Sequence, residues 1–201
     1  DPATGRFDLG PAILELGGFA IGRFDRLKLA TDVMQKLTAE TRLVSLLCVW
    51  GTNGPTVIRG ERGDLDIAIR IREGTNLSTI ATSMGRIFLA HQVSADAPPI
   101  FERDLAVLNE NLPRGRKMKQ PDLEAIRQRV IRAGYARAEG LRNPLLSGVA
   151  APIFGSGKRL VFGLSLVGLR NSFSANEKSE VVQRLMAAGK SLSGVLATTT
   201  N

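Results

Sequence analysis

The segment 42–50 constrains the fold of this chain more than any other part of it, because it is apolar on both faces. Side chains along a strand point alternately to opposite sides. The two apolar sets are Leu43, Leu47 and Val49, and Val44, Leu46 and Cys48. A strand with two apolar faces must be covered on both sides. The sequence therefore predicts a sheet with further structure packed against each of its faces.

The remaining segments follow an order that is typical of an α+β fold. Apolar residues spaced three and four apart predict helices over 25–40, 79–90, 101–112 and 121–133. Pro121 and Gly134 are suited to the two ends of the last of these. Alternation predicts strands over 42–50, 65–72, 135–139, 148–154 and 159–169. A capping-box pattern, Ser174 to Glu177, predicts the start of a closing helix.

Turn residues indicate how the strands are connected. Residues 52–54 contain an Asn-Gly pair, and residues 155–157 contain two glycines, both of which are typical of tight hairpins. Hairpins, in place of alternating strand–helix crossovers, favour an antiparallel sheet covered by helices. We therefore assign the chain to the α+β class.

Small residues mark one face of the two late strands. On the strand 159–169, Leu160, Phe162, Leu164 and Leu166 share one face, whereas the other carries Gly163, Ser165 and Val167. Gly148 lies on the neighbouring strand. A face without bulk admits either a closely packed helix or a ligand cavity. Buried hydroxyl groups need a hydrogen-bond partner, and a ligand oxygen would serve for Ser165 and for Ser147.

The helix that begins near Thr82 offers a second feature of such a cavity. The first turn of a helix has free backbone N–H groups and the positive end of the helix dipole, which together hold a carboxylate. Ser83 and Met84 stand at this position. The alternative is an ordinary capped helix in the core.

Composition and spacing disfavour several other classes of protein. The chain has 201 residues, 43% of them hydrophobic, and a net charge of +8. Its densest basic stretch, 114–119, lacks interleaved aromatic residues and is read as a solvated loop in preference to a nucleic-acid contact. Residues 155–158 lack the first glycine and the final Ser/Thr of a phosphate loop. One cysteine, Cys48, fits a reducing, cytoplasmic compartment, and the longest apolar run is too short to span a membrane.

Six motifs in order resemble one family. They are TGRFDLGPAILELG at the start, the helix end at 38–41, ATSMGRIFLA, VIRAGYA, GVAAPIF and LSLVG. Together they resemble the effector-binding domain of bacterial transcription factors of the isocitrate lyase regulator (IclR) type. The resemblance implies a GAF- or profilin-like domain, with a curved antiparallel sheet of about six strands and helices on its faces.

The resemblance also implies partners and a domain division. Residues 1–24 would be a linker helix region that follows a missing N-terminal winged helix-turn-helix domain, and residues 25–201 would be the effector-binding domain. Operator DNA would be bound only through the missing domain. The family assembles as dimers or tetramers and binds small organic acids or aromatic compounds, so no catalytic residue, metal or cofactor is expected.

The expected ligand site follows residue by residue from the resemblance. Matched positions are Ser83, Met84, Ala138, Gly148, Ser165 and Val167. Trp50 and Ser147 are added from their places on neighbouring strands. Ala138 stands where relatives carry an acidic run, so the site lacks a carboxylate and is more apolar. We therefore expect an aromatic or bulky carboxylate in preference to a two-carbon acid.

Two other classes of function stay open at this point. One is a purely structural oligomerisation domain, whose sheet face is filled and binds no ligand. The other is an enzyme with a related sensor fold that uses Cys48 as its nucleophile, although nothing in the sequence orients His91 as a base for it.

Overall fold

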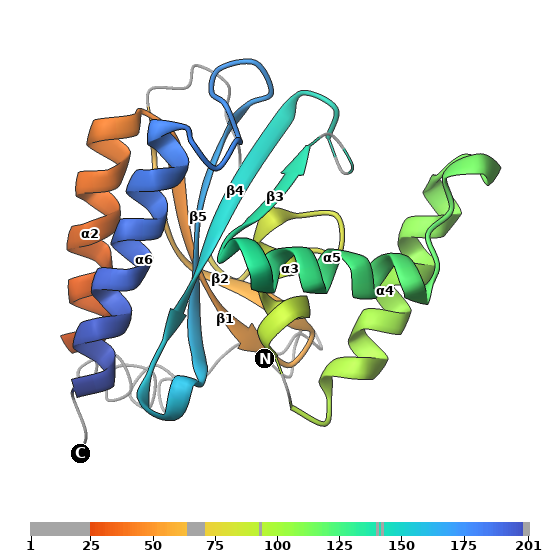
Figure 1. The fold of residues 1–201 in the computed structure, drawn as a ribbon, viewed down its shortest axis with the longest axis horizontal. Helices are drawn as coiled ribbons and strands as arrows, with labels where there is room; N and C mark the ends of the chain where they lie inside the picture. Colours follow the sequence, from red (N-terminus) through yellow and green to blue (C-terminus); the bar gives the residue numbers. More distant parts are fainter. Residues whose placement is uncertain (1–24, 64–70, 93, 140, 142, 199–201) are drawn as a thin grey trace, which may run out of the picture.

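One antiparallel sheet separates two layers of helices in a computed structural model, which describes residues 25–63, 71–92, 94–139, 141 and 143–198 (Figure 1). Its strand order is β2-β1-β5-β4-β3. The strands are β1 (Val44–Gly51), β2 (Gly54–Glu61), β3 (Ala136–Glu139), β4 (Leu146–Phe154) and β5 (Leu160–Leu169). Every neighbouring pair is antiparallel. The predicted α+β class with an antiparallel sheet is confirmed.

The helices divide between the two faces of this sheet (Figure 1). Helices α2 (Asp25–Thr41) and α6 (Glu180–Thr198) share one core with the sheet. Helices α3 (Ser83–His91), α4 (Ala97–Asn111) and α5 (Gln120–Ala133) contribute to the core on the other face. No helix among the described residues is long and apolar enough to cross a membrane.

Strand β1 is covered on both sides, as its two apolar sets predict. Leu43 and Leu47 belong to the core beneath α2 and α6, whereas Leu46 and Cys48 belong to the core beneath α3. Leu47 and Cys48 are both fully buried. Each face of the strand therefore contributes to a separate hydrophobic core.

The face prediction for β5 is correct except at its first residue. Phe162, Leu164 and Leu166 pack toward α2 and α6, but Leu160 joins the opposite core. The β4–β5 register shifts between Ile153 and Phe154, so that Phe154 pairs with Leu160. An irregularity of this kind breaks the simple alternation of faces at the strand end.

Turn chemistry locates two hairpins correctly. Gly54 closes the β1–β2 turn with φ +107°, and the β4–β5 turn has Gly157 at φ +66°. The second strand of the first hairpin is β2, which the sequence did not predict. The expected strand 65–72 lies largely, and the expected linker 1–24 entirely, outside the described residues. Within the described residues the sheet has five strands.

Helix ends are predicted unevenly. Helix α5 ends at Gly134, whose φ is +72°, as expected. Helix α6 begins at Glu180, after the expected capping box. Ser174 Oγ instead accepts a hydrogen bond from the Asn176 amide, which closes a local turn, and Ser179 Oγ accepts one from the Val182 amide. Helices α3 and α4 also begin four residues away from the expected 79 and 101, at Ser83 and Ala97.

Two helical glycines give a matched test of this packing. A Cβ on Gly85 would overlap the carbonyl oxygen of Ser78 and lie 2.5 Å from Thr79 Cα, whereas a Cβ on Gly194 would meet nothing within 4 Å. We expect Gly85→Ala to lower the free energy of unfolding by about 3 kcal/mol, because backbone atoms must move. Gly194→Ala should raise it by about 0.8 kcal/mol. Urea unfolding followed by circular dichroism measures both, and equal effects would contradict the packing.

Candidate functional site

The first turn of α3 is fixed by a capping residue. Thr82 has the extended backbone of an N-cap, and its Oγ1 accepts a hydrogen bond from the Gly85 amide at 2.9 Å. The same hydroxyl donates to the Ser78 carbonyl oxygen at 2.7 Å. The helix start is thus connected to the segment that precedes it, and the Thr82 cap matches the sequence expectation.

Asp104 of α4 holds that preceding segment in place. Its Oδ2 accepts hydrogen bonds from Ser78 Oγ at 2.9 Å and from Thr79 Oγ1 at 2.6 Å, and also from the Thr79 and Ile80 amides. A carboxylate that accepts several such bonds strongly restricts the groups that donate them. The approach to α3 is therefore fixed by a residue about 25 positions away, and no local pattern in the sequence signals this contact.

The Arg86 side chain links α3 to β3, the strand at one edge of the sheet. Its guanidinium donates to the carbonyl oxygens of Ile80 at 2.8 Å and of Arg137, in β3, at 2.6 Å. Burial, together with the nearby charges of Arg129 and Arg137, lowers the pKa of Arg86 to about 10. The group still carries its charge at neutral pH, and its role in the structure is to bridge the helix and β3.

Helix α3 lies directly on the small residues of the sheet. A Cβ on Gly163 would overlap Met84 Sδ and come within 3.2 Å of the Phe88 ring. A Cβ on Gly148 would lie 2.8 Å from Ser83 Oγ. The hollow expected at Gly163 is therefore filled by side chains of α3. Small residues here permit close helix packing, which is the other alternative that the sequence left open.

Most of the predicted ligand-site residues do meet beneath α3. Ala138, Gly148 and Val167 form one row across β3, β4 and β5. Ser165 lies in the next row, between Leu46 of β1 and Ala150 of β4. Ser83 and Met84 cover this area from the helix. Four of the eight predicted residues thus lie on one face of the sheet, and two more face it from α3.

Ser165 carries an unusual polar atom in this area. Its side chain is 1% exposed, and its hydroxyl has no hydrogen-bond partner among the described residues, a property that it shares with Nε2 of His91 at the other end of α3. An unpaired buried hydroxyl is costly and rare in proteins. Ser45, equally buried on the opposite face, instead bonds Thr38 Oγ1 at 2.7 Å. Among the described residues, Ser165 therefore has an unused hydrogen-bonding group on this face.

Ser147 lies on the opposite face of the sheet, whereas Trp50 lies on the same face but farther along α3. Ser147 alternates with Gly148 and so shares the α2 and α6 face with Val149. Trp50 packs at the far end of α3, with ring centroids 5.8 Å from Phe88 and 5.7 Å from Phe101. Its Nε1 donates to Asp96 Oδ2 at 3.0 Å.

Cys48 is poorly suited to act as a nucleophile. The residue is fully buried in the middle of β1, and burial raises the pKa of its thiol well above the ordinary value. The nucleophilic form of cysteine is the thiolate. His91 packs edge-on against Phe154 at 5.2 Å, and burial and then Arg127 lower its pKa. The described residues contain no group of three or more side chains suited to a metal.

The sheet with helices on both faces is the GAF-like fold, which solved structures of IclR-type regulators share. The HmgR protein of Pseudomonas aeruginosa superposes with a TM-score of 0.77 at 24% identity, over 100% of this chain and 79% of that one. The Thermotoga maritima IclR superposes with a TM-score of 0.73 at 20% identity, over 93% of this chain and 74% of that one.

Sequence comparison identifies the family. Residues 19–194 match the model of the bacterial transcriptional regulator IclR C-terminal domain. The HTH-type transcriptional regulators RhmR and XynR of Escherichia coli K12 are 25% and 23% identical to the chain. The matches cover 94% and 98% of this chain and 72% and 77% of those proteins. The chain belongs to the IclR family and corresponds to its C-terminal domain.

Removing the Asp104 carboxylate should loosen the approach to α3. We expect Asp104→Ala to lower the free energy of unfolding by about 2 kcal/mol, because the buried Thr79 hydroxyl loses its acceptor. Glu102→Ala on the exposed side of α4 serves as the control and should change stability by less than about 0.5 kcal/mol. Chemical unfolding of both variants measures the difference.

Burial of Cys48 should be visible in its reactivity. A disulfide reagent such as DTNB is expected to leave the native chain unmodified and to react with its single thiol once urea has unfolded it. Rapid reaction of the native protein would mean that the thiol is accessible and would revive the enzymatic alternative.

Proposed function

We propose that this domain senses a small organic acid for a bacterial transcription factor. The acid would bind beneath the first turn of α3 and alter operator binding by an N-terminal helix-turn-helix domain, to which residues 1–24 would be the linker. The observation that carries the proposal is the buried, unpartnered hydroxyl of Ser165 beneath that turn.

The recognition chemistry follows from the groups around Ser165. Its hydroxyl would donate to a ligand carboxylate, which the positive end of the α3 dipole also favours. Met84, which occupies the space above Gly163, would have to move aside, and a methionine side chain adapts its shape readily. The uncharged neighbours Ala138 and Val167 favour an aromatic or bulky acid.

Regulation would arise from a difference in affinity between two arrangements of the regulator. A ligand shifts such an equilibrium only by the amount that its binding free energy differs between the two states. We infer a homodimer or homotetramer in the cytoplasm as the setting, with no enzymatic activity. Family membership and the regulators that the chain resembles support this inference.

A second candidate is a structural oligomerisation domain that binds no effector. The filled space above Gly163 favours it, because Met84 and Phe88 leave no hollow at that position. Ligand binding that depends on the residues beneath α3 decides between the two functions.

Calorimetric titration with a panel of acids tests the proposal. Benzoate and phenylacetate should bind, whereas glyoxylate and pyruvate should bind at least about tenfold more weakly, a difference of 1.4 kcal/mol. Binding confined to glyoxylate or pyruvate would refute the expected ligand class. No binding of any acid would support the structural alternative.

Two buried serines locate the site. Ser165→Ala should weaken the binding of the acid about tenfold, yet raise the free energy of unfolding by about 1 kcal/mol, because it removes an unpaired polar group. Ser45→Ala should leave binding unchanged and lower stability by about 1 kcal/mol, because Thr38 loses its partner. Calorimetry and urea unfolding read out both effects, and unchanged affinity in Ser165→Ala would place the site elsewhere.

A further inference from the structure

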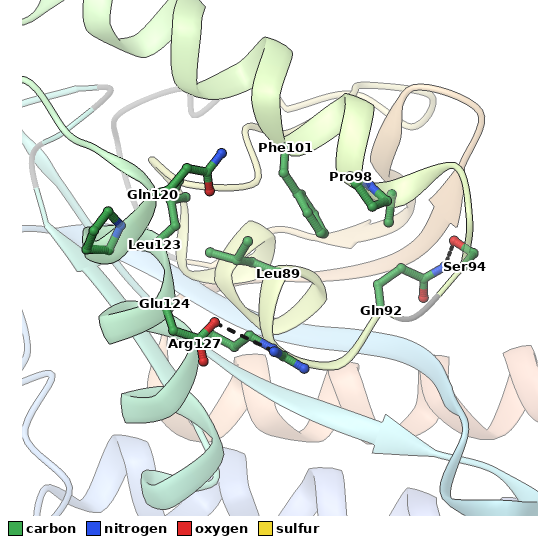
Figure 2. A pocket seen from close by; sticks show the side chains of 11 residues that line it. Leu89, Gln92, Ser94, Pro98, Phe101, Gln120, Leu123, Glu124 and Arg127 are labelled. Atoms are coloured by element: carbon green, nitrogen blue, oxygen red, sulfur yellow. Dashed lines mark hydrogen bonds and ion pairs between the residues drawn. The ribbon is translucent and has the colours of Figure 1, made fainter.

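A cavity of about 620 Å³ lies between the end of α3, the start of α4 and the first half of α5 (Figure 2). None of the residues predicted for the effector site lines it. Its volume falls within the range of small-molecule sites in proteins, about 300 to 1,000 Å³. The cavity is therefore large enough for a ligand of its own.

The walls of this cavity are mainly apolar. Leu89 and Leu123 are buried core residues, and Figure 2 shows their side chains and the Phe101 ring converging on one space. The Phe101 ring is held in position by an edge-on contact with the Trp50 ring. A held aromatic ring beside two leucines suits a flat apolar body, which gains both buried area and ring contact.

Arg127 supplies the cavity with a cationic group that is weakly engaged. Its Nη1 lies 3.6 Å from Glu124 Oε2, and its Nε donates to the Ala90 carbonyl oxygen at 3.4 Å, which is long. Both side chains of the ion pair are about half exposed, and such pairs contribute only about 0 to 1 kcal/mol. A guanidinium has five N–H donors, so Arg127 retains donors for an incoming anion, which would take the place of the Glu124 carboxylate that lines the same cavity.

The shape and charge together define a ligand class. We propose that this cavity is a second ligand site, which takes an aromatic monocarboxylate with its ring against Phe101, Leu89 and Leu123 and its carboxylate on Arg127. Arg127 can hold a carboxylate through two parallel hydrogen bonds. Gln92 and Gln120 also line the cavity, and Gln92 Nε2 donates to Ser94 Oγ at 2.7 Å.

This site stands apart from the proposed effector function but adjoins the same helix. Phe101 and Asp104 lie on one helix, and Asp104 holds the segment that precedes α3. A ligand that presses on Phe101 would therefore act on the element that positions the first turn of α3. Such a connection makes the second site suited to modulate the first.

Titration of the chain with phenylacetate tests the proposal. The measurement compares the unaltered chain with Ser165→Ala, in which the effector site should bind about tenfold more weakly. A saturable binding event whose affinity is the same in both is assigned to the second site and is expected, together with a change in the emission of Trp50, which is the single tryptophan of the chain and contacts Phe101. Absence of such a binding event would overturn the second site whatever becomes of the first.

Matched variants and ligands test the role of Arg127. Arg127→Gln should weaken phenylacetate binding about tenfold. The neutral analogue 2-phenylethanol should bind the unaltered chain about tenfold more weakly than phenylacetate does. Arg132→Gln removes the same charge from an exposed position of α5 outside the cavity and should leave affinity unchanged. Equal losses of phenylacetate affinity in the two variants would indicate a general charge effect. Unchanged affinity in Arg127→Gln would mean that Arg127 does not bind the carboxylate. Either result overturns the proposal.

Discussion

The closeness of α3 to the sheet is the constraint on which the candidate site depends. Two positions beneath the helix, Gly148 and Gly163, have no room for a side chain, because Ser83, Met84 and Phe88 occupy the space above them. The helix reaches this position because Asp104 and Arg86 fix its two flanks. Its first turn and the Ser165 hydroxyl are consequently held on the same side of the sheet.

The sequence predicts those features whose physical cause is local. The alternation of apolar residues in β1 predicts both of its faces correctly. Gly134 marks the end of α5, because glycine readily adopts the positive φ that often follows the last helical residue. The sequence does not predict strand β2. Its residues include apolar, polar and strand-breaking types without alternation, and its formation depends on pairing with β1. The capping box at Ser174 forms a turn in place of a helix start, because Ser179 supplies the cap.

The sequence predicts the candidate site only in part, because small residues on a sheet face are compatible with two different structures. Glycine on a sheet face permits either a cavity or a helix in close contact, and only the position of α3 decides between them. Ser165, Gly148, Ala138 and Val167, which the family resemblance assigns to the ligand site, lie on one face of the sheet, whereas adding Ser147 by proximity ignores that neighbouring residues point to opposite sides. The cavity beside Arg127 depends on three helices meeting, which no local pattern encodes.

The strand order has a consequence for the synthesis of this protein. Strand β5 joins β1 to β4 at the centre of the sheet, yet it follows every other described strand along the chain. A growing polypeptide can form the β1–β2 hairpin early, but the two halves of the sheet stay separate until residues 160–169 have left the ribosome. Until then β1 and β4 each present an open edge to other chains, and such edges favour aggregation. Incomplete translation products that stop before β5 should therefore depend strongly on chaperones.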